Sequence, residues 1–247
     1  MTRHMMCATP TAFPATNHMF TRILTSAVFA GAAAGLISAL LQLVFVQPVL
    51  LHAELYESGK LVHLGAEAVS AKQDVGSPDL MRNGLSILFN MLTFVGYALV
   101  LVAGMVLAQT RGHIATARNG LIWGIAGFIV FHFAPGLSLA PEVPGVAAAD
   151  VGERQIWWSG TVVAAGLALW LIAFGRTWIM WGVAIVLLLA PHLIGAPEPD
   201  SFAGPVPTEL GALFAARAFG VGLAGWVLLG CVAGYFWHRE DPASTPA

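Results

Sequence analysis

The sequence predicts an all-α integral membrane protein with about six transmembrane helices, arranged as three parallel helical hairpins. Two observations support this fold class. Of the 247 residues, 57% are hydrophobic and only 10% are charged, whereas a soluble domain carries about 25% charged residues. So few charges cannot cover a surface in water, and a lipid bilayer is the expected surrounding. The second observation is a short sequence motif that recurs at the ends of apolar runs, which indicates a reused structural unit.

Six apolar runs supply the predicted helices. A helix that spans a membrane needs about 20 residues, within a range near 17–25. Four runs reach that length easily, whereas the third contains Pro135 and the fifth contains Pro191. Each proline removes a backbone donor and ends or kinks its helix. Between tails at 1–18 and 239–247, we expect a domain over 19–238 with spans at 23–46, 85–108, 121–139, 156–174, 178–194 and 210–237.

The distribution of arginine predicts the orientation. Loops that remain in the cytoplasm carry an excess of Lys and Arg. If both termini lie in the cytoplasm, the short inner loops are basic and nearly free of acids, and the outer loops hold most of the acids. We therefore expect an N-in, C-in topology. The arginines on the inner side are then Arg3, Arg22, Arg111, Arg118, Arg176 and Arg239.

Glycine pairs predict where helices pack closely. Small residues four positions apart allow two helix backbones to approach each other in a membrane. Each pair is a weak signal alone, because glycine is frequent in membrane helices. The pairs in this chain are Gly31 with Gly35, Gly120 with Gly124, and Gly230 with Gly234.

The recurring motif has the pattern A-P-x-L-x-x-A-P-E. It occupies residues 134–142 and 190–198, and a looser copy at 48–54 ends the first apolar run. We expect each copy to end a membrane helix at its proline and to place a carboxylate just beyond that helix. In a parallel arrangement of hairpins, all three copies would fall on the outer side.

The acids that end these copies are candidates for cation capture. Glu54, Glu142 and Glu198 would form a ring at the outer mouth, and rings of carboxylates select cations and raise their local concentration. Asp150 and Glu153 would add negative field nearby. The simpler interpretation is a set of solvated loop acids, and their equivalent positions in the repeat count against it.

Three histidines accompany the same copies. His52 precedes Glu54 by two residues, His132 precedes Pro135 by three, and His192 directly follows Pro191. Imidazole suits first-row transition metals and carboxylate suits harder cations, so the mixed set predicts a site for cobalt, nickel or zinc. The alternative is that each histidine lies at the interface and makes a single hydrogen bond.

Other polar residues inside the runs predict a path through the membrane. Arg217 is the one full charge within a run, and it either extends to the outer water or pairs with a mouth carboxylate as a gate. Pro135 and Pro191 would break their helices so that backbone carbonyls face the path. Gln42 and Gln47 could line a cavity near an unwound helix end.

Several functions lack their sequence features. The net charge of −2 gives no indication of nucleic-acid binding, and two cysteines cannot form a disulfide framework. The chain contains no nucleotide-binding G-x-x-x-x-G-K-[ST] loop, no H-E-x-x-H zinc motif and no G-x-S-x-G nucleophile elbow. We therefore predict no enzyme, no catalytic residues and no resident cofactor.

Four stretches together match a known pattern. They are Gln47-Pro48 leading to Ala53-Glu54-x-Tyr56-Glu57, Ala134-Pro135 through Pro141-Glu142-Val143-Pro144-Gly145, Arg154-Gln155 before Trp157-Trp158, and Pro191-His192. Through these motifs, which span nearly all of the chain from Met19, the sequence resembles the CbtA family of predicted cobalt transporter subunits. Family members typically begin close to this Met19, and they are often described with five spans rather than six.

The resemblance implies cobalt uptake across a bacterial inner membrane, usually linked to cobalamin synthesis. It also implies a small partner, CbtB, which is a membrane subunit with a histidine-bearing end. The leading hypothesis is therefore a multi-pass subunit of the inner membrane that admits Co²⁺.

Other hypotheses compete with this one. The chain could be an assembly subunit that transports nothing itself and docks a histidine-bearing partner, or it could carry Ni²⁺ or Zn²⁺. A membrane enzyme or haem-binding electron carrier would need His132 and His192 to face each other. No residue distinguishes uptake from export.

Overall fold

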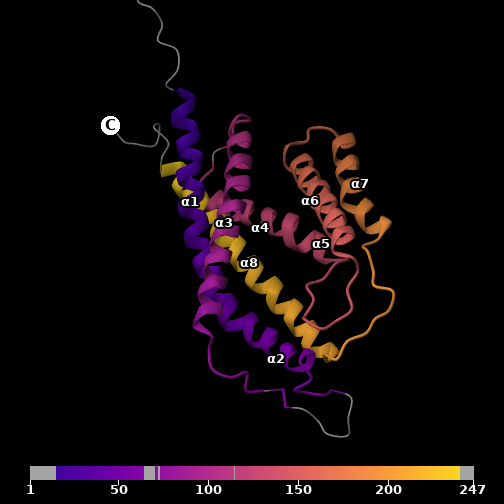
Figure 1. Cartoon of the computed structure of the whole chain (residues 1–247). Coiled ribbons are helices and arrows are strands. Elements are labelled where there is room, and N and C mark those ends of the chain that lie inside the picture. Colours follow the sequence, from indigo (N-terminus) through magenta and orange to yellow (C-terminus); the bar gives the residue numbers. More distant parts are fainter. Residues whose placement is uncertain (1–14, 64–69, 72, 114, 240–247) are drawn as a thin grey trace, which may run out of the picture.

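The computed structural model describes residues 15–63, 70–71, 73–113 and 115–239, which form helices joined by loops (Figure 1). Five helical stretches are long and apolar enough to cross a membrane: Met19–Glu57, Leu80–Gln109, Ala117–Gly136, Val151–Phe174 and Thr208–Arg239. The helix α7 (Trp178–Ile194) is apolar but only 17 residues long, close to the lower limit for a span. The tails predicted over 1–18 and 239–247 lie almost entirely outside the described residues.

The chain begins four of its helices at capping side chains. A capping oxygen accepts a hydrogen bond from a backbone N–H that the first helical turn leaves without a partner. Asp79 caps α3 (Leu80–Gln109), Thr116 caps α4 (Ala117–Phe128), Asp150 caps α6 (Val151–Phe174) and Thr177 caps α7. The second span therefore starts five residues before the expected position 85, because Asp79 provides a start signal outside the apolar run.

The first span continues past its proline, so our expectation that this copy of the motif ends a helix at Pro48 is wrong. Helix α1 (Ala15–Leu41) passes through a π-helical turn, η1 (Gln42–Val46), into α2 (Gln47–Glu57). Because proline lacks an N–H and its ring crowds the carbonyl four residues earlier, the wider π turn just before Pro48 accommodates it. Glu54 consequently lies within α2 and not beyond a helix end.

A second π turn precedes Pro135. Helix α4 continues through η2 (Ile129–Phe133) into the short α5 (Ala134–Gly136). The Ala134 N–H bonds to the Ile129 carbonyl, just as the Gln47 N–H bonds to the Gln42 carbonyl in η1. The helix ends at Gly136, three residues before the expected position 139. Pro191 lies inside α7, which continues for three residues beyond it.

Glycine brings the main helices together at the predicted positions. A Cβ atom added to Gly120 would lie 2.1 Å from the Gly230 carbonyl oxygen, and one added to Gly234 would lie 2.4 Å from the Thr116 oxygen. Helix α4 therefore crosses α8 (Thr208–Arg239) with backbones in direct contact. One added to Gly31 would lie 2.4 Å from Val95 Cα, so α1 packs equally closely on α3. The glycine-pair prediction is confirmed.

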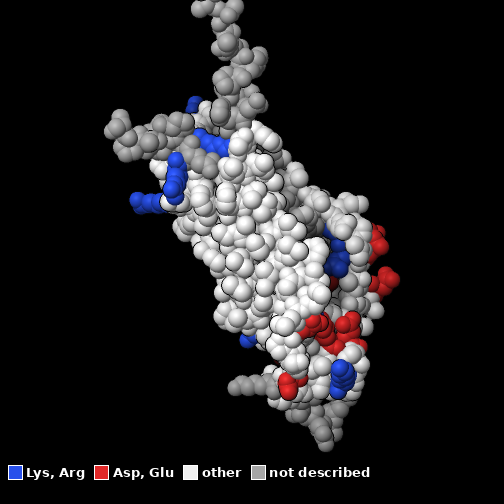
Figure 2. Space-filling view, turned by 60° about the vertical axis from the view of Figure 1, so that its left-hand side comes forward, with Lys and Arg blue, Asp and Glu red and all other residues white. Residues whose placement is uncertain are grey.

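The loops that follow α2, α5 and α7 meet at one end of the molecule, which we call the acidic end. Ala53 and Tyr56 of α2 pack there with Val143 and Val206, and the Ala147 N–H donates to the Ala203 carbonyl at 2.8 Å. Most of the acids visible in Figure 2 gather at this end.

The start of α1 and the end of α8 meet at the opposite end, which we call the basic end. The Arg22 guanidinium lies 3.9 Å from the ring centre of Trp237, and the Trp237 indole donates to Gln109 Oε1 at 3.0 Å. The two outermost helix ends therefore share one side, as a six-span chain requires. Which side faces the cytoplasm stays a prediction.

Helices α6 and α7 form a hairpin set beside the other helices (Figure 1). Both α6 and α8 run from the acidic end to the basic end, so α7 between them returns in the opposite direction. Helix α7 contacts mainly α6, and of its residues only Ala184 is buried. Repetition of the hairpins as a structural unit stays a hypothesis.

The contact between α4 and α8 yields a stability prediction. Gly230→Ala forces a methyl group into the Gly120 backbone, so we expect a loss of about 1–3 kcal/mol of stability, seen as a lower thermal midpoint of the detergent-purified protein. Gly220→Ala, also in α8, is the matched control, because no described atom other than its chain neighbours and its own helix backbone lies within 4 Å of an added Cβ. Equal midpoints for the two variants would contradict the close crossing.

Candidate functional site

A file of polar side chains runs along the interface between α1–α2 and α3. Gln47 Nε2 donates to Asn83 Oδ1 at 2.7 Å, and Gln42 Nε2 donates to Asn90 Oδ1 at 3.2 Å. The file begins near the acidic end and extends towards the middle of the membrane-spanning helices. Polar side chains in such helices are costly and usually functional.

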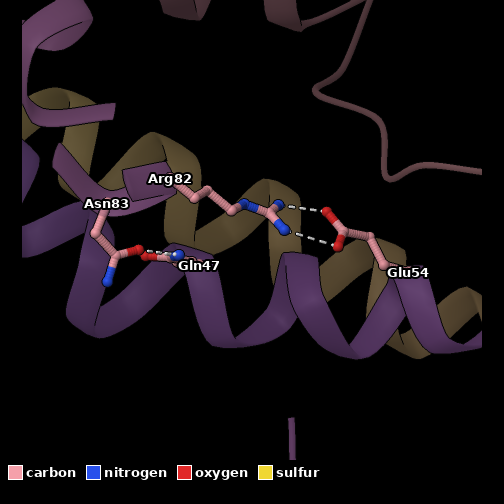
Figure 3. Close-up of polar contacts among 4 residues, drawn as sticks. All are labelled: Gln47, Glu54, Arg82 and Asn83. Carbon is pink, nitrogen blue, oxygen red and sulfur yellow. Dashed lines mark hydrogen bonds and ion pairs between the residues drawn. The ribbon is translucent and has the colours of Figure 1, made fainter. Parts of the chain in front are cut away.

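An ion pair stands at the end of this file that lies nearest the acidic end (Figure 3). Arg82 forms a bidentate ion pair with Glu54 through its two terminal guanidinium nitrogens: Nη1 donates to Oε2 at 2.9 Å and Nη2 donates to Oε1. A two-pronged pair of this kind is stronger and more directional than a single contact. About a third of each side chain is exposed, so water and small cations can reach the pair.

The inner end of the file opens into a cavity of about 270 Å³. It lies between the two π turns, because Gln42 and Val46 come from η1 and His132 comes from η2. A smaller cavity of about 120 Å³, lined by Arg82 and Gln47, shares Gln42 and Val46 with it. The two cavities are therefore adjacent, and they lie between Arg82 and His132. The polar residues that line the larger one are Ser38, Gln42, Asn90, Thr93, Tyr97 and His132.

One polar atom in this cavity has no partner. Ser38 is 1% exposed, and its Oγ makes no hydrogen bond to any described residue. By contrast, Asn90 Nδ2 donates to the Gly35 carbonyl at 2.8 Å and the Thr93 hydroxyl to the Phe89 carbonyl at 2.8 Å. Because buried polar atoms are nearly always bonded, this hydroxyl is available to bind a polar species in the cavity.

His132 is held by an indole. The Trp226 Nε1–H donates to His132 Nδ1 at 3.1 Å, and an indole nitrogen is a donor only. The neutral ring must then carry its proton on Nε2. In this arrangement His132 presents an N–H donor, and it becomes a metal ligand only when Trp226 releases Nδ1 or when Nε2 loses its proton.

The other two predicted histidines lie elsewhere. His52 is 8% exposed, stacks on Tyr56 with ring centres 5.5 Å apart, and leaves Nε2 without a hydrogen-bond partner in the described part of the chain. His192 Nδ1 shares a hydrogen bond of 2.8 Å with Ser138 Oγ. His132 and His192 thus have different partners, so this arrangement gives no support to a haem held between them.

The mouth acids are placed differently from one another. Glu142 is paired with Arg154 at 2.8 Å, whereas Glu198 is exposed. Among the described residues, no three His, Cys, Asp or Glu side chains converge on one point where a metal ion could bind. The metal set of Glu54, Glu142, Glu198, His52, His132 and His192 stays a prediction.

The predicted gating and path residues have identifiable contacts. Arg217 Nη1 donates to the Phe45 carbonyl of η1 at 3.0 Å, and within the described ranges it meets no carboxylate. The Pro191 carbonyl accepts from the Trp157 indole at 3.2 Å and the Asp150 carboxylate caps α6. Pro135 is buried within α5.

Sequence reasoning missed Ser38, Asn90, Tyr97 and Trp226 as parts of this site. A signal existed: Asn83, Ser86, Asn90, Thr93 and Tyr97 recur every three or four residues, which places them on one face of α3.

The comparisons with known proteins agree with the membrane architecture. No protein with a curated description matches the chain, and no solved structure does. One family, described as "Probable cobalt transporter subunit (CbtA)", matches residues 20–238. The chain therefore belongs to the CbtA family of probable cobalt transporter subunits, with helices suited to a multi-pass membrane protein.

Proposed function

We propose that this chain takes up Co²⁺ across a bacterial inner membrane, receiving the ion at the acidic end and passing it through the polar cavity. The single observation that carries this proposal is the series of polar side chains that leads from Glu54–Arg82, along two adjacent cavities, to Ser38 and His132. A polar route at this depth has a high desolvation cost, so a transporter has reason to keep it where a purely structural protein does not.

Capture begins at the mouth carboxylates. Glu198 is free to attract the hydrated ion, and Asp150 and Glu153 strengthen the negative field. Glu54 is already neutralised by Arg82 and Glu142 by Arg154, so Co²⁺ must displace each arginine. This exchange admits only an ion with enough charge to replace the guanidinium, which favours divalent over monovalent cations.

Transfer through the bundle replaces water with protein ligands. His52 and His192 supply imidazole near the acidic end, and His132 supplies it in the cavity after Trp226 releases Nδ1. The turns around Pro135 and Pro191 contribute backbone oxygens. Arg217, bonded to the Phe45 carbonyl, acts as the positive gate on this route and moves aside as the ion passes.

The membrane potential can drive this movement. It supplies about 2.3 kcal/mol per charge per 100 mV. For a divalent ion the amount doubles to roughly 4.6 kcal/mol, or a concentration ratio of about a thousandfold. With both termini in the cytoplasm, the acidic end faces outward and the potential favours uptake.

A second candidate function follows from the open side of the cavity. Gln42 and Thr93 line it and are exposed at membrane depth, where lipid cannot satisfy polar groups. A small histidine-bearing membrane subunit, as the family resemblance implies, could cover this side. In that case the path forms between two chains, and this chain alone transports nothing.

Radioactive cobalt uptake in cells tests both candidates. We expect uptake that depends on this chain and is lost in the triple variant Glu54→Gln, Glu142→Gln, Glu198→Gln at normal membrane levels. Uptake that requires the candidate partner as well would favour the shared path. Full uptake by the triple variant would rule out the mouth acids as the capture site, and competition by nickel or zinc identifies the preferred metal.

The ion pair yields a prediction in two opposite directions. Glu54→Gln removes a ligand and should raise the half-saturating cobalt concentration about fivefold, whereas Arg82→Gln frees the carboxylate and should lower it about fivefold, since an exposed pair contributes up to about 1 kcal/mol. Glu57 is an exposed acid in the same helix, so Glu57→Gln is the control and should leave the half-saturating cobalt concentration unchanged. Shifts in the same direction for both variants would mean that the pair is only structural.

The cavity yields a matched pair of threonine variants. Thr93 and Thr161 each donate a hydroxyl to the carbonyl four residues earlier, at 2.8 and 2.9 Å, but only Thr93 lines the polar cavity. We expect Thr93→Val to reduce the cobalt uptake rate several-fold and Thr161→Val to leave it near the wild-type rate. Equal rates would argue against passage of the ion through this cavity.

A further inference from the structure

A third and larger cavity of about 490 Å³ lies between α6 and the helices α3, α4 and α8. Aromatic rings form much of its wall, and glycines at 104 and 166 leave space between them. The principal rings are Trp123, Phe131, Trp170 and Phe174. None of its polar lining residues belongs to the polar cavity, so the metal path gives no reason for its existence.

The cavity is polar at one end and apolar along its depth. Its polar lining residues are His113 and Asn119, and both lie where α3 turns into α4 at the basic end. The Arg111 guanidinium lies over the Trp170 ring at 4.8 Å and the Phe174 ring at 5.8 Å. The His113 and Phe174 rings form a T-shaped pair, with their centres 5.0 Å apart. A fixed positive charge therefore stands at the mouth of an apolar slot.

This charge has no carboxylate partner among the described residues. The Arg111 guanidinium lies instead over the two aromatic rings. Arg118 precedes Asn119 in α4, and Arg176 lies in the turn between α6 and α7, two residues after Phe174. Three arginines thus lie within two residues of the lining residues at this end, and their charge complements an anion.

The slot is shorter than a bilayer is thick. Along α4 and η2 its lining runs from Asn119 to Phe131, which is about 18 Å at 1.5 Å per residue. The hydrocarbon core of a bilayer is about 30 Å thick, so a slot of this length accommodates part of an acyl chain and does not cross the membrane.

We infer that this cavity binds an anionic phospholipid, with an acyl chain between α4 and α6 and the phosphate beside Arg111 and His113. The apolar walls select a lipid over a free phosphate ion, and the unpaired arginine selects an anionic over a zwitterionic headgroup. Basic pockets between membrane helices are known to recognise such headgroups. The bound acyl chain would join the α6–α7 hairpin to α4. Without it, the hairpin contacts the other helices mainly through η2 and α5.

Native mass spectrometry of the full chain in detergent tests this inference. The protein is incubated with equal amounts of phosphatidylglycerol and phosphatidylcholine that carry the same acyl chains, and with glycerol phosphate in a separate sample. We expect the phosphatidylglycerol adduct to exceed the phosphatidylcholine adduct about fivefold and glycerol phosphate to leave no adduct. Equal lipid adducts on the wild-type protein would overturn the inference, and so would a glycerol phosphate adduct as abundant as the lipid.

Variants assign the lipid to this cavity. Arg111→Gln should reduce the preference to nearly one, whereas Arg239→Gln, the same change at the same end but away from the cavity, should retain it. Gly166→Leu should lower both lipid adducts several-fold, because its side chain fills the slot and the nearest atom to the added Cβ, in Val130, is 3.8 Å away. Circular dichroism verifies that each variant is folded. Undiminished lipid adducts in Gly166→Leu, or a full phosphatidylglycerol preference in Arg111→Gln, would show that the lipid binds elsewhere.

Discussion

The hydrogen-bond requirement of a backbone in lipid is the constraint on which the rest of this structure depends. Lipid offers a backbone no hydrogen bonds, so a helix that contains proline must satisfy its backbone in another way. Here the helix widens by one π turn before Pro48 and again before Pro135. Arg217 adds a donor to the Phe45 carbonyl in the first of these turns. The same two turns carry Gln42 and His132, so the accommodation of proline also builds the polar cavity.

The ion pairs at the acidic end change what the acids can do. Two paired carboxylates contribute little net field, because Arg82 and Arg154 cancel most of it at a distance. Their contribution appears only when a cation comes close enough to replace the guanidinium. An acid-rich surface of this kind discriminates by exchange more than by long-range attraction. The exposed Glu198 provides the long-range part, and the two parts complement each other.

The sequence was sufficient for the membrane class, the all-helical architecture and the glycine contacts. These features depend on local composition and on residues four positions apart. The pairing of Glu54 with Arg82 was not predictable, because it depends on how α2 lies against α3, 28 residues further along the chain. The continuation of the helix through Pro48 was missed for a related reason. A proline signals a break locally, and only the surrounding packing decides whether a π turn absorbs it.

Trp226 connects the two cavities physically. Its indole N–H is directed at His132 in the polar cavity, while its ring lines the apolar cavity and stacks on Phe131 at 5.3 Å. Neighbouring glycines on α4 leave no spare room: a Cβ added to Gly127 would lie 2.2 Å from the Trp226 ring. A movement of this indole that frees His132 Nδ1 must therefore also reshape the wall of the apolar cavity. An acyl chain in that cavity would restrict the ring, so the occupant of one cavity influences which nitrogen of His132 is available in the other.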